Sequence, residues 1–497
     1  MDLSYEIDSL NLISVSTSTY SGKNSSKMDL STAMLSNNLD TVQSYKQHNE
    51  SSGMWGGYNA NFDYQRSFMK PDKLFTFSYH LDYSPGNNES DMDLSGIRNY
   101  EDRHQKIESQ SLSTEHTFQA DYTEPFNKKH ILEIGAKYII RNNGSESDYT
   151  TFDKTTGVWI PTPGMKDNDL QYNQGILGAY GSYTFKMKEY SLRAGWRLEH
   201  TSSTVDFRNN PEQNFDVPSF TNLVPSLNIT YRLNEKNNFR LSYNQRLSRP
   251  GIWYLNPYVN STNPEYVSQG NPNLKTEVSK SFDLNYGFVS PKFNVNISVY
   301  SSFTNNSIEN VTELRDSIVY STYKNIGISQ NSGLSTYFSW QANSKLSFYS
   351  NASLGYSRMS DRTGETGLQS SGINYNVYLG GNYKLPKEFR ISWNGSYNSP
   401  YISLQGKGSP FYYYGLNLTK SMLKRKLNIS LNANSFIEKN RTRKSYTETA
   451  TFRNENTYIY PARRIGLSVS YTFGQMKEQI KKAQRSISNN DVKAGGE

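Results

Sequence analysis

The sequence predicts an all-β fold, a transmembrane antiparallel β-barrel with about nineteen visible strands. Three observations predict it. Segments of strict alternation between apolar and polar residues recur from end to end, and tight connections between them alternate with long polar ones. The 497 residues are only 35% hydrophobic but 14% aromatic. A soluble domain with so few aliphatic residues could not fill its core, and a disordered chain would lack the aromatic residues.

Residues 281–288 illustrate the alternation, since Phe282, Leu284, Tyr286 and Phe288 share one face and polar residues share the other. Side chains alternate across a strand, so each such segment has one apolar face and one polar face. The predicted strands are 2–7, 10–20, 51–67, 72–84, 109–123, 129–142, 171–186, 188–206, 219–233, 236–249, 275–290, 292–313, 316–341, 344–358, 371–385, 387–401, 411–424, 425–438 and 457–474.

Short turns at one rim and long loops at the other are typical of outer-membrane barrels, in which the turns are periplasmic and the loops extracellular. No stretch approaches about 18 consecutive apolar residues, which excludes a helical membrane protein. In hydrocarbon every backbone polar group must be paired, so a spanning sheet must close. The predicted long loops are 21–50, 85–108, 143–170, 207–218, 250–274, 359–370, 402–410 and 439–456.

Charge and motif content exclude several function classes. The net charge is +8, but no basic run with interleaved aromatics stands out, so we expect no nucleic-acid partner. Cysteine is absent, which excludes a disulfide framework and a thiol nucleophile. The six histidines lack metal-ligand spacing, and neither a G-x-S-x-G elbow nor a phosphate-binding glycine loop occurs. We therefore expect no catalytic residue, no metal, no cofactor and no enzymatic activity.

Residues 243–288 contain a loop rich in Pro, Gly and Asn between two predicted strands. The X-Pro pairs impose extended or turn geometry, and Gly-Asn supplies a tight reversal, so the loop has a fixed shape. Its spine resembles the barrel of TonB-dependent receptors and, more narrowly, the outer-membrane β-barrel family related to them. The residues that carry this resemblance are Arg249, Pro250, Asn256, Pro257, Gly270, Asn271, Pro272, Leu274 and Glu277.

Two interpretations of this loop stay open. It either contacts cargo or a plug, or it braces two long strands, and we favour the brace. If it binds a ligand, the candidates are the loop and lumen residues Trp253, Tyr254, Tyr258, Tyr266, Arg246 and Arg249. The lumen arginines Arg193, Arg197, Arg240 and Arg246 attract an anionic cargo or pair with carboxylates across the lumen, and we favour pairing.

The last alternating segment resembles the closing strand that the outer-membrane assembly machinery recognises, with Leu467, Val469, Tyr471 and Phe473 on one face. We therefore divide the chain into a barrel, residues 1–474, and a charged periplasmic tail, residues 475–497. Met476, Ile480 and Ala483 have helical spacing, but a solvated tail is the favoured interpretation.

The resemblance implies a receptor or transporter in the outer membrane of a Gram-negative cell, for uptake of a siderophore, vitamin or glycan. It implies as partners the outer-membrane lipid and lipopolysaccharide, the barrel-assembly machinery, and the TonB energy-transducing complex. It also implies a plug domain and a signal peptide, and we expect neither within these 497 residues. A separate plug fragment is therefore a further expected partner.

Strand direction predicts that the barrel is truncated at its N-terminus. The last strand leads to a periplasmic tail, and counting back makes the first visible strand run in the same direction. About nineteen strands plus three would give the 22 of large transporters, so we expect a fragment of a longer receptor. The alternatives are a plugless diffusion pore with an odd strand number and a soluble β-rich glycan-binding protein.

Overall fold

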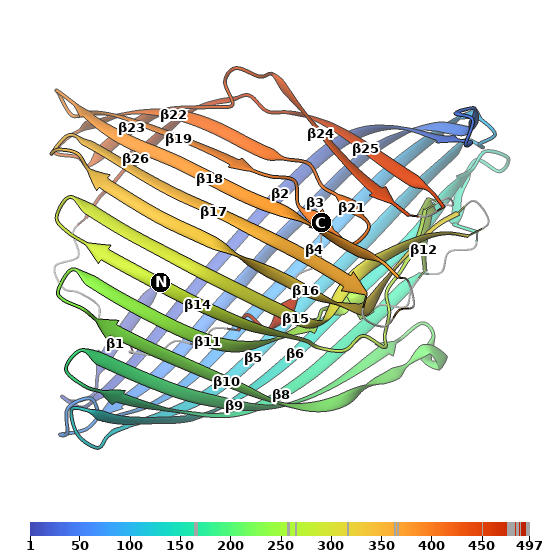
Figure 1. Ribbon diagram of the computed structural model, residues 1–497. Coiled ribbons are helices and arrows are strands. Elements are labelled where there is room, and N and C mark those ends of the chain that lie inside the picture. The colour runs from blue at the N-terminus through green and yellow to red at the C-terminus, as the bar shows by residue number, and fades with distance from the viewer. Residues whose placement is uncertain are drawn as a thin grey trace.

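The computed structural model describes the chain except for residues 164–166, 256–258, 264–265, 316–317, 362–363, 365–366, 450, 475–482, 484–486, 488 and 494–497. The chain is almost entirely β-structure, and its long strands form one curved wall (Figure 1). Within these described residues, no helix has the length and apolar character needed to cross a membrane.

In the described part of the chain, the wall is a meander of nineteen strands, each antiparallel to the next. This confirms the predicted fold class. The strands, in order, are β1 (Asp2–Glu6), β2 (Asn11–Leu35), β3 (Thr41–Ser67), β4 (Leu74–Arg98), β5 (Arg103–Pro125), β6 (His130–Asp153), β8 (Asn168–Lys186), β9 (Tyr190–Phe207), β10 (Phe215–Arg232), β11 (Asn237–Pro250), β14 (Glu277–Val289), β15 (Phe293–Arg315), β16 (Ile318–Gln341), β17 (Leu346–Asp361), β18 (Gln369–Leu385), β19 (Phe389–Asn398), β22 (Phe411–Met422), β23 (Leu427–Asn434) and β26 (Arg464–Tyr471).

Short elements lie outside this meander. Four of them extend the main sheet, and four form a separate small sheet. The first four are β7 (Val158–Pro161), β12 (Val259–Asn263), β13 (Tyr266–Gln269) and β27 (Val492–Lys493). The second four are β20 (Ile402–Ser403), β21 (Gly406–Lys407), β24 (Asn440–Glu448) and β25 (Arg453–Pro461). The two helical turns are the 3-10 helix η1 (Pro211–Gln213) and α1 (Ile252–Leu255).

The outer face of the wall is apolar and exposed, and the inner face is polar and covered. In β14, Phe282 and Leu284 are 47% and 50% exposed, whereas their neighbours Asp283 and Asn285 are half-buried. In β9, Leu198 is 45% exposed, while Glu199 beside it is buried. A soluble protein shows the opposite arrangement, because its apolar face is packed in the core. Exposed aliphatic bands are typical of a surface that contacts lipid.

Four predicted loops are wrong, because strands occupy most of their residues; one of them, 439–456, contains the β24–β25 hairpin. Residues 21–50, 85–108 and 143–170 contain the distal ends of β2 to β8. The β2–β3 ladder, for example, runs without interruption from Asn11↔Arg66 to Met34↔Gln43. With 25 residues, β2 extends roughly 80 Å at about 3.3 Å per residue, well beyond a membrane. Residues 21–27 of β2 include no apolar side chain, so the apolar–polar alternation is interrupted there even though the strand continues.

The predicted strand 457–474 is also wrong, because it divides into parts of two strands. Residues 457–461 end β25, which pairs with β24 in the small sheet. The wall strand β26 begins only at Arg464 and pairs with β23. Pro461 ends β25, since proline has no N–H group to continue a ladder.

The meander begins at β1 and ends at β26. An odd number of antiparallel strands makes β1 and β26 run in the same direction, as strand counting predicted. Across the described residues, no ladder joins β1 to β26. Every residue of β26 is exposed.

Candidate functional site

The inner face of the wall holds two buried arginines, Arg141 on β6 and Arg249 at the end of β11, here called the arginine pair. Their exposed fractions are 6% and 1%. Each has a carboxylate partner on the wall. The Nε of Arg141 donates to Glu115 Oε2 at 2.5 Å, and the Nη2 of Arg249 donates to Glu199 Oε2 at 2.6 Å. Buried charges are tolerated when they are paired in this way.

Strand geometry places these side chains. Arg141 has the same parity as Lys137, which lies on the inner face, and the opposite parity to Tyr138, which is exposed on the outer face. Arg249 lies where β11 separates from one neighbour. The β10–β11 ladder ends at Ser226↔Asn244, whereas the β11–β14 ladder continues to Ser248↔Glu277. Released from β10, the end of β11 directs Arg249 toward Glu199 and Thr201 on β9.

Residues Asn489–Lys493 of the C-terminal region lie against this inner face, and we call them the lumen segment. Asp491 accepts hydrogen bonds from both members of the arginine pair: from Arg141 Nη2 at 2.7 Å and Nη1 at 2.9 Å, and from Arg249 Nη1 at 2.7 Å. Asn489 Nδ2 donates to Glu115 and Thr117 on β5, at 2.5 and 2.7 Å. The interior of the wall therefore recognises specific side chains of the lumen segment.

Lys493, two residues after Asp491, makes a second contact with the wall. Lys493 Nζ donates to Glu277 Oε1 at 2.6 Å and to the Ile308 carbonyl oxygen at 2.8 Å. The short strand β27 pairs in parallel with the end of β11, with Arg249 opposite Val492 and Pro250 opposite Lys493. Both the side chains and the backbone of the segment are therefore bound.

Opposing effects act on the pKa of Asp491. Burial alone would raise the pKa of this carboxyl group, because it disfavours the charged form. The hydrogen bonds and positive charges of Arg141 and Arg249 outweigh burial and lower the pKa of Asp491 to about 2. The carboxylate is therefore ionised at any physiological pH.

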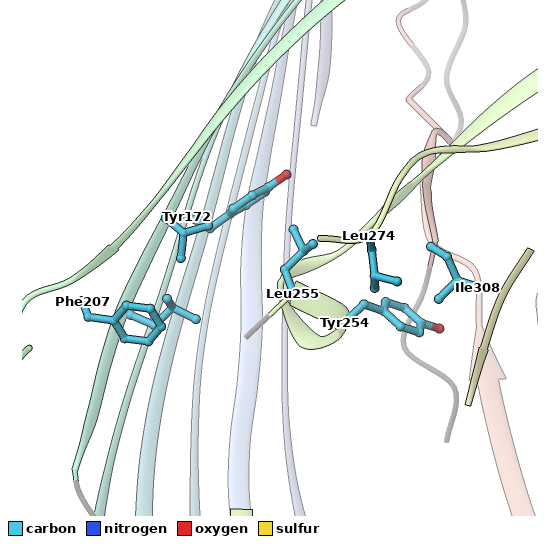
Figure 2. Packing of buried hydrophobic residues seen from close by; sticks show 8 residues of the cluster. Tyr172, Phe207, Tyr254, Leu255, Leu274 and Ile308 are labelled. Carbon is cyan, nitrogen blue, oxygen red and sulfur yellow. The ribbon is translucent and has the colours of Figure 1, made fainter. Parts of the chain in front are cut away.

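The loop between β11 and β14 is anchored to the wall by a hydrophobic cluster (Figure 2). Tyr254 and Leu255 of α1 and Leu274 near the end of the loop contribute to it, with exposed fractions of 4%, 1% and 4%. The wall contributes Leu170 and Tyr172 from β8, Val205 and Phe207 from β9, and Ile308 from β15. Apolar packing therefore holds the loop in one place.

Hydrogen bonds of Asn271 support the same arrangement. Its backbone N–H donates to the Tyr254 carbonyl oxygen at 2.7 Å, and its side chain donates to the Tyr323 carbonyl oxygen on β16 at 2.9 Å. Glu277, just after the loop, accepts from the Ile308 backbone N–H at 2.6 Å. The motif residues Asn271, Leu274 and Glu277 thus join the loop to the wall.

A polar cavity of about 690 Å³ lies beside the lumen segment. Wall residues such as Asp121, Lys137 and Arg246 line it, together with Asn489, Asn490 and Asp491. A second cavity of about 620 Å³ shares Glu133, Arg193 and Asn228 with the first. The two cavities are therefore adjacent hollows along the same inner face.

Two of the lumen arginines pair with carboxylates, as predicted, but along the wall and not across the lumen. Arg193 Nη2 lies 2.6 Å from Glu133, and Arg197 Nε lies 2.7 Å from Glu199. For Arg240 and Arg246, the described residues provide no carboxylate within ion-pair distance, and both line the cavities.

The predicted ligand-binding residues separate in the structure. Trp253 and Tyr266 are 66% and 42% exposed on the loop, whereas Tyr254 and Arg249 are buried within contacts of the chain itself. Gly270 and Pro272 flank Asn271, where the loop turns back to the wall. Asn256, Pro257 and Tyr258 lie outside the described residues.

The residues of the predicted assembly signal lie on β26 and just after it. Leu467, Val469, Tyr471 and Phe473 are 56–84% exposed.

The prediction of a solvated periplasmic tail is wrong for residues 489–493, which are bound inside the wall. The predicted helical spacing of Met476 and Ile480 falls outside the described residues. Asp491, Arg141, Glu115 and Glu199 were not predicted as site residues. Arg141 could have been noticed as a charge on the polar face of the strand predicted at 129–142. Nothing in the sequence pairs it with a residue 350 positions away.

Residues 66–471 match the sequence pattern of the outer membrane protein beta-barrel family. No curated protein matches the sequence.

Three solved structures illustrate the likeness of fold. A copper transporter, OprC, has 13% identity and a TM-score of 0.58, with 93% of this chain and 78% of the other covered. The siderophore receptor PiuA from Acinetobacter baumannii has 11% identity and a TM-score of 0.56, with 95% and 78% covered. The ferric yersiniabactin uptake receptor FyuA from Yersinia pestis has 11% identity and a TM-score of 0.54, with 95% and 77% covered.

Proposed function

The chain belongs to the outer membrane protein beta-barrel family, and from this premise we propose that it is an outer-membrane receptor of the TonB-dependent type, which takes up a scarce ligand. The observation that carries the proposal is the charged inner face of a lipid-exposed wall. Its interior is occupied by protein, namely the anchored loop and the lumen segment. Protein inside the barrel narrows the path of a solute, and its movement would widen that path, as an energised receptor requires and an open pore does not.

The proposed ligand class is a siderophore, vitamin or glycan. Among the structures with this fold, PiuA is a siderophore receptor, FyuA is a ferric yersiniabactin uptake receptor and OprC is a copper transporter. Trp253 and Tyr266 are the proposed contact residues, because both are aromatic, exposed and held on an anchored loop. Aromatic rings with accessible faces suit flat or ring-shaped ligands.

The proposed partners follow from the location of the barrel. Lipid and lipopolysaccharide surround the exposed apolar band, and the barrel-assembly machinery recognises the exposed face of β26. The TonB complex supplies energy, and a plug domain, in a longer form of this protein or as a separate fragment, completes the gate. The family and the transporter structures agree with the expected lack of enzymatic activity.

Uptake by whole cells tests the proposal. We expect deletion of the gene to abolish accumulation of one labelled ligand from a panel of iron siderophores, cobalamin and oligosaccharides. Dissipation of the proton gradient should abolish it too. The W253A variant should reduce the affinity for that ligand, and the control variant I437A, at an exposed residue of another loop, should not.

The competing function is a plugless diffusion pore, and planar bilayers distinguish the two. A receptor with an occupied lumen should show no steady conductance. Steady ohmic conductance of the purified chain, together with uptake that does not need the proton gradient, would contradict the proposed function.

A further inference from the structure

Five consecutive residues, Asn489–Lys493, are held on the inner face by wall strands that are far apart in the meander. The contacts come from Glu115 and Thr117 on β5, Lys137 and Arg141 on β6, Arg249 on β11, Glu277 on β14 and Ile308 on β15. The bound segment therefore connects parts of the wall that do not pair with each other.

We infer that the lumen contains a binding site for an extended peptide with a carboxylate two residues ahead of an ammonium group, and that residues 489–493 of this chain occupy it. The site is an intramolecular peptide-binding site, which neither the family nor the solved structures of this fold assign to the chain. Its occupant is the chain's own C-terminal segment.

The arginine pair is held in place by the wall itself. Arg141 is bound to Glu115, and Arg249 is bound to Glu199 and Thr201, by contacts that do not involve the lumen segment. Removing the segment would leave each guanidinium with a carboxylate partner. The site is therefore preorganised, and binding costs little side-chain ordering in the wall.

The arginine pair recognises a carboxylate by geometry as well as by charge. Asp491 accepts two bonds from Arg141 and a third from Arg249. A planar guanidinium matches both oxygens of a carboxylate, which adds geometric selectivity to the charge. An amide at this position would accept fewer of these bonds and would carry no charge.

The backbone contacts select an extended peptide. The Arg249 N–H donates to the Asp491 carbonyl oxygen at 2.8 Å, and β27 continues the pairing in parallel. Adding a strand to a free edge is a general way to bind peptides, in which the side chains supply specificity. The free edge is available here because β11 has separated from β10.

The ammonium site lies at the other end of the segment. Glu277 is 6% exposed and binds Lys493 Nζ, which also lies 5.8 Å from the centre of the Tyr254 ring. Tyr254 belongs to the anchored loop, so the segment contacts both the wall and the loop. Release of the segment would therefore remove one of the contacts that hold the loop.

A disulfide test exploits the absence of cysteine from the chain. A Cβ atom built at Gly251 lies 3.5 Å from Val492 Cγ1, close enough for a disulfide with little movement. We expect the double variant G251C/V492C to form this bond upon mild oxidation in membranes, seen as faster migration on a non-reducing gel. The control I437C/V492C, with Ile437 exposed on another loop, should not form it.

Charge variants in the G251C/V492C background test recognition. D491N removes charge-assisted hydrogen bonds, so we expect the rate of disulfide formation to fall about tenfold or more. E277Q should lower it less. The control N490A changes an exposed neighbour of Asp491 and should leave the rate unchanged. The inference would be overturned if G251C/V492C formed its disulfide no faster than I437C/V492C does. It would also be overturned if D491N left the rate of disulfide formation unchanged.

The consequence for transport rests on the proposed function and can fail separately. Oxidation of G251C/V492C fixes the segment in the lumen, so we expect uptake to stop and reduction to restore it. If the disulfide forms but uptake never occurs, the proposed function fails and the peptide site stands. If uptake is normal and the disulfide does not form, the peptide site fails alone.

Discussion

Arg249 shows what a buried charge requires inside a barrel. Its guanidinium bonds to Glu199, Thr201 and Asp491, and only 1% of the residue is exposed. Removing one member of a buried ion pair usually costs more than the pair contributes, because the remaining charge stays in a poor solvent.

We expect R249Q to destabilise the barrel by about 3–5 kcal/mol, the range for broken buried pairs. The measurement is the urea concentration at which the folded, heat-modifiable band disappears. The matched control is R193Q, since Arg193 is half-exposed in its pair with Glu133. That variant should cost about 0–1 kcal/mol. Equal effects of the two variants would contradict the assigned role of burial.

The low pKa of Asp491 predicts how binding of the lumen segment depends on pH. The bound pKa, about 2, is below the ordinary value of 3.8. The ionic contribution is therefore complete above about pH 4 and is lost as the pH falls through about 2. The titratable and charged groups that surround this carboxylate are Arg141, Arg249, Lys137, Glu115 and Glu199.

A nitroxide label on N490C reports this dependence. We expect an immobilised spectrum from pH 8 down to pH 4 and a more mobile one below about pH 3. In D491N, the same label should be mobile throughout. A transition near pH 6 would show that another group controls binding.

At the scale of elements, the loop between β11 and β14 depends on a few apolar side chains. Leu255 is 1% exposed among side chains from β8 and β9, whereas Trp253 two residues earlier is 66% exposed. The short helix α1 directs these two neighbours to different environments.

We expect L255A to destabilise the barrel by about 2–5 kcal/mol, because it leaves a cavity in a packed cluster. Cleavage of the loop by added protease should become faster. W253A should stay within about 0.5 kcal/mol of the wild type, as surface substitutions do. If L255A is as stable as W253A, the cluster does not anchor the loop.

The strands also show which parts of the fold the sequence pattern could predict. Alternation located β9, β14 and β15 within a few residues, because lipid on one side and water on the other impose a period of two. It failed for the distal halves of β2 to β6, where runs of polar residues interrupt the alternation, although Tyr45, Met92 and Leu94 form a small buried cluster there. There, backbone pairing to neighbouring strands keeps the chain extended.

At the scale of the whole molecule, the arrangement of faces decides where the protein resides. Leu284 points outward between its partners Leu241 and Val299, and Asn285 beside it points inward. These two neighbouring residues therefore face different solvents.

We expect L284R to cost about 2–4 kcal/mol, the range for arginine at the lipid-facing midplane of a barrel. N285R places the same side chain in the wet lumen and should cost much less. The amount of folded barrel in the outer-membrane fraction measures both effects. Equal yields for the two variants would contradict the assignment of lipid to this face.

The sequence by itself determined the membrane barrel, the number and order of its strands and the rim with tight turns, because these follow from local alternation and local turn chemistry. Only the tertiary structure decided that Asp491 meets Arg141 and Arg249, and that residues 489–493 lie inside the wall. Those contacts join residues hundreds of positions apart. Their energies depend on burial and on the separation of β11 from β10, which no local pattern records.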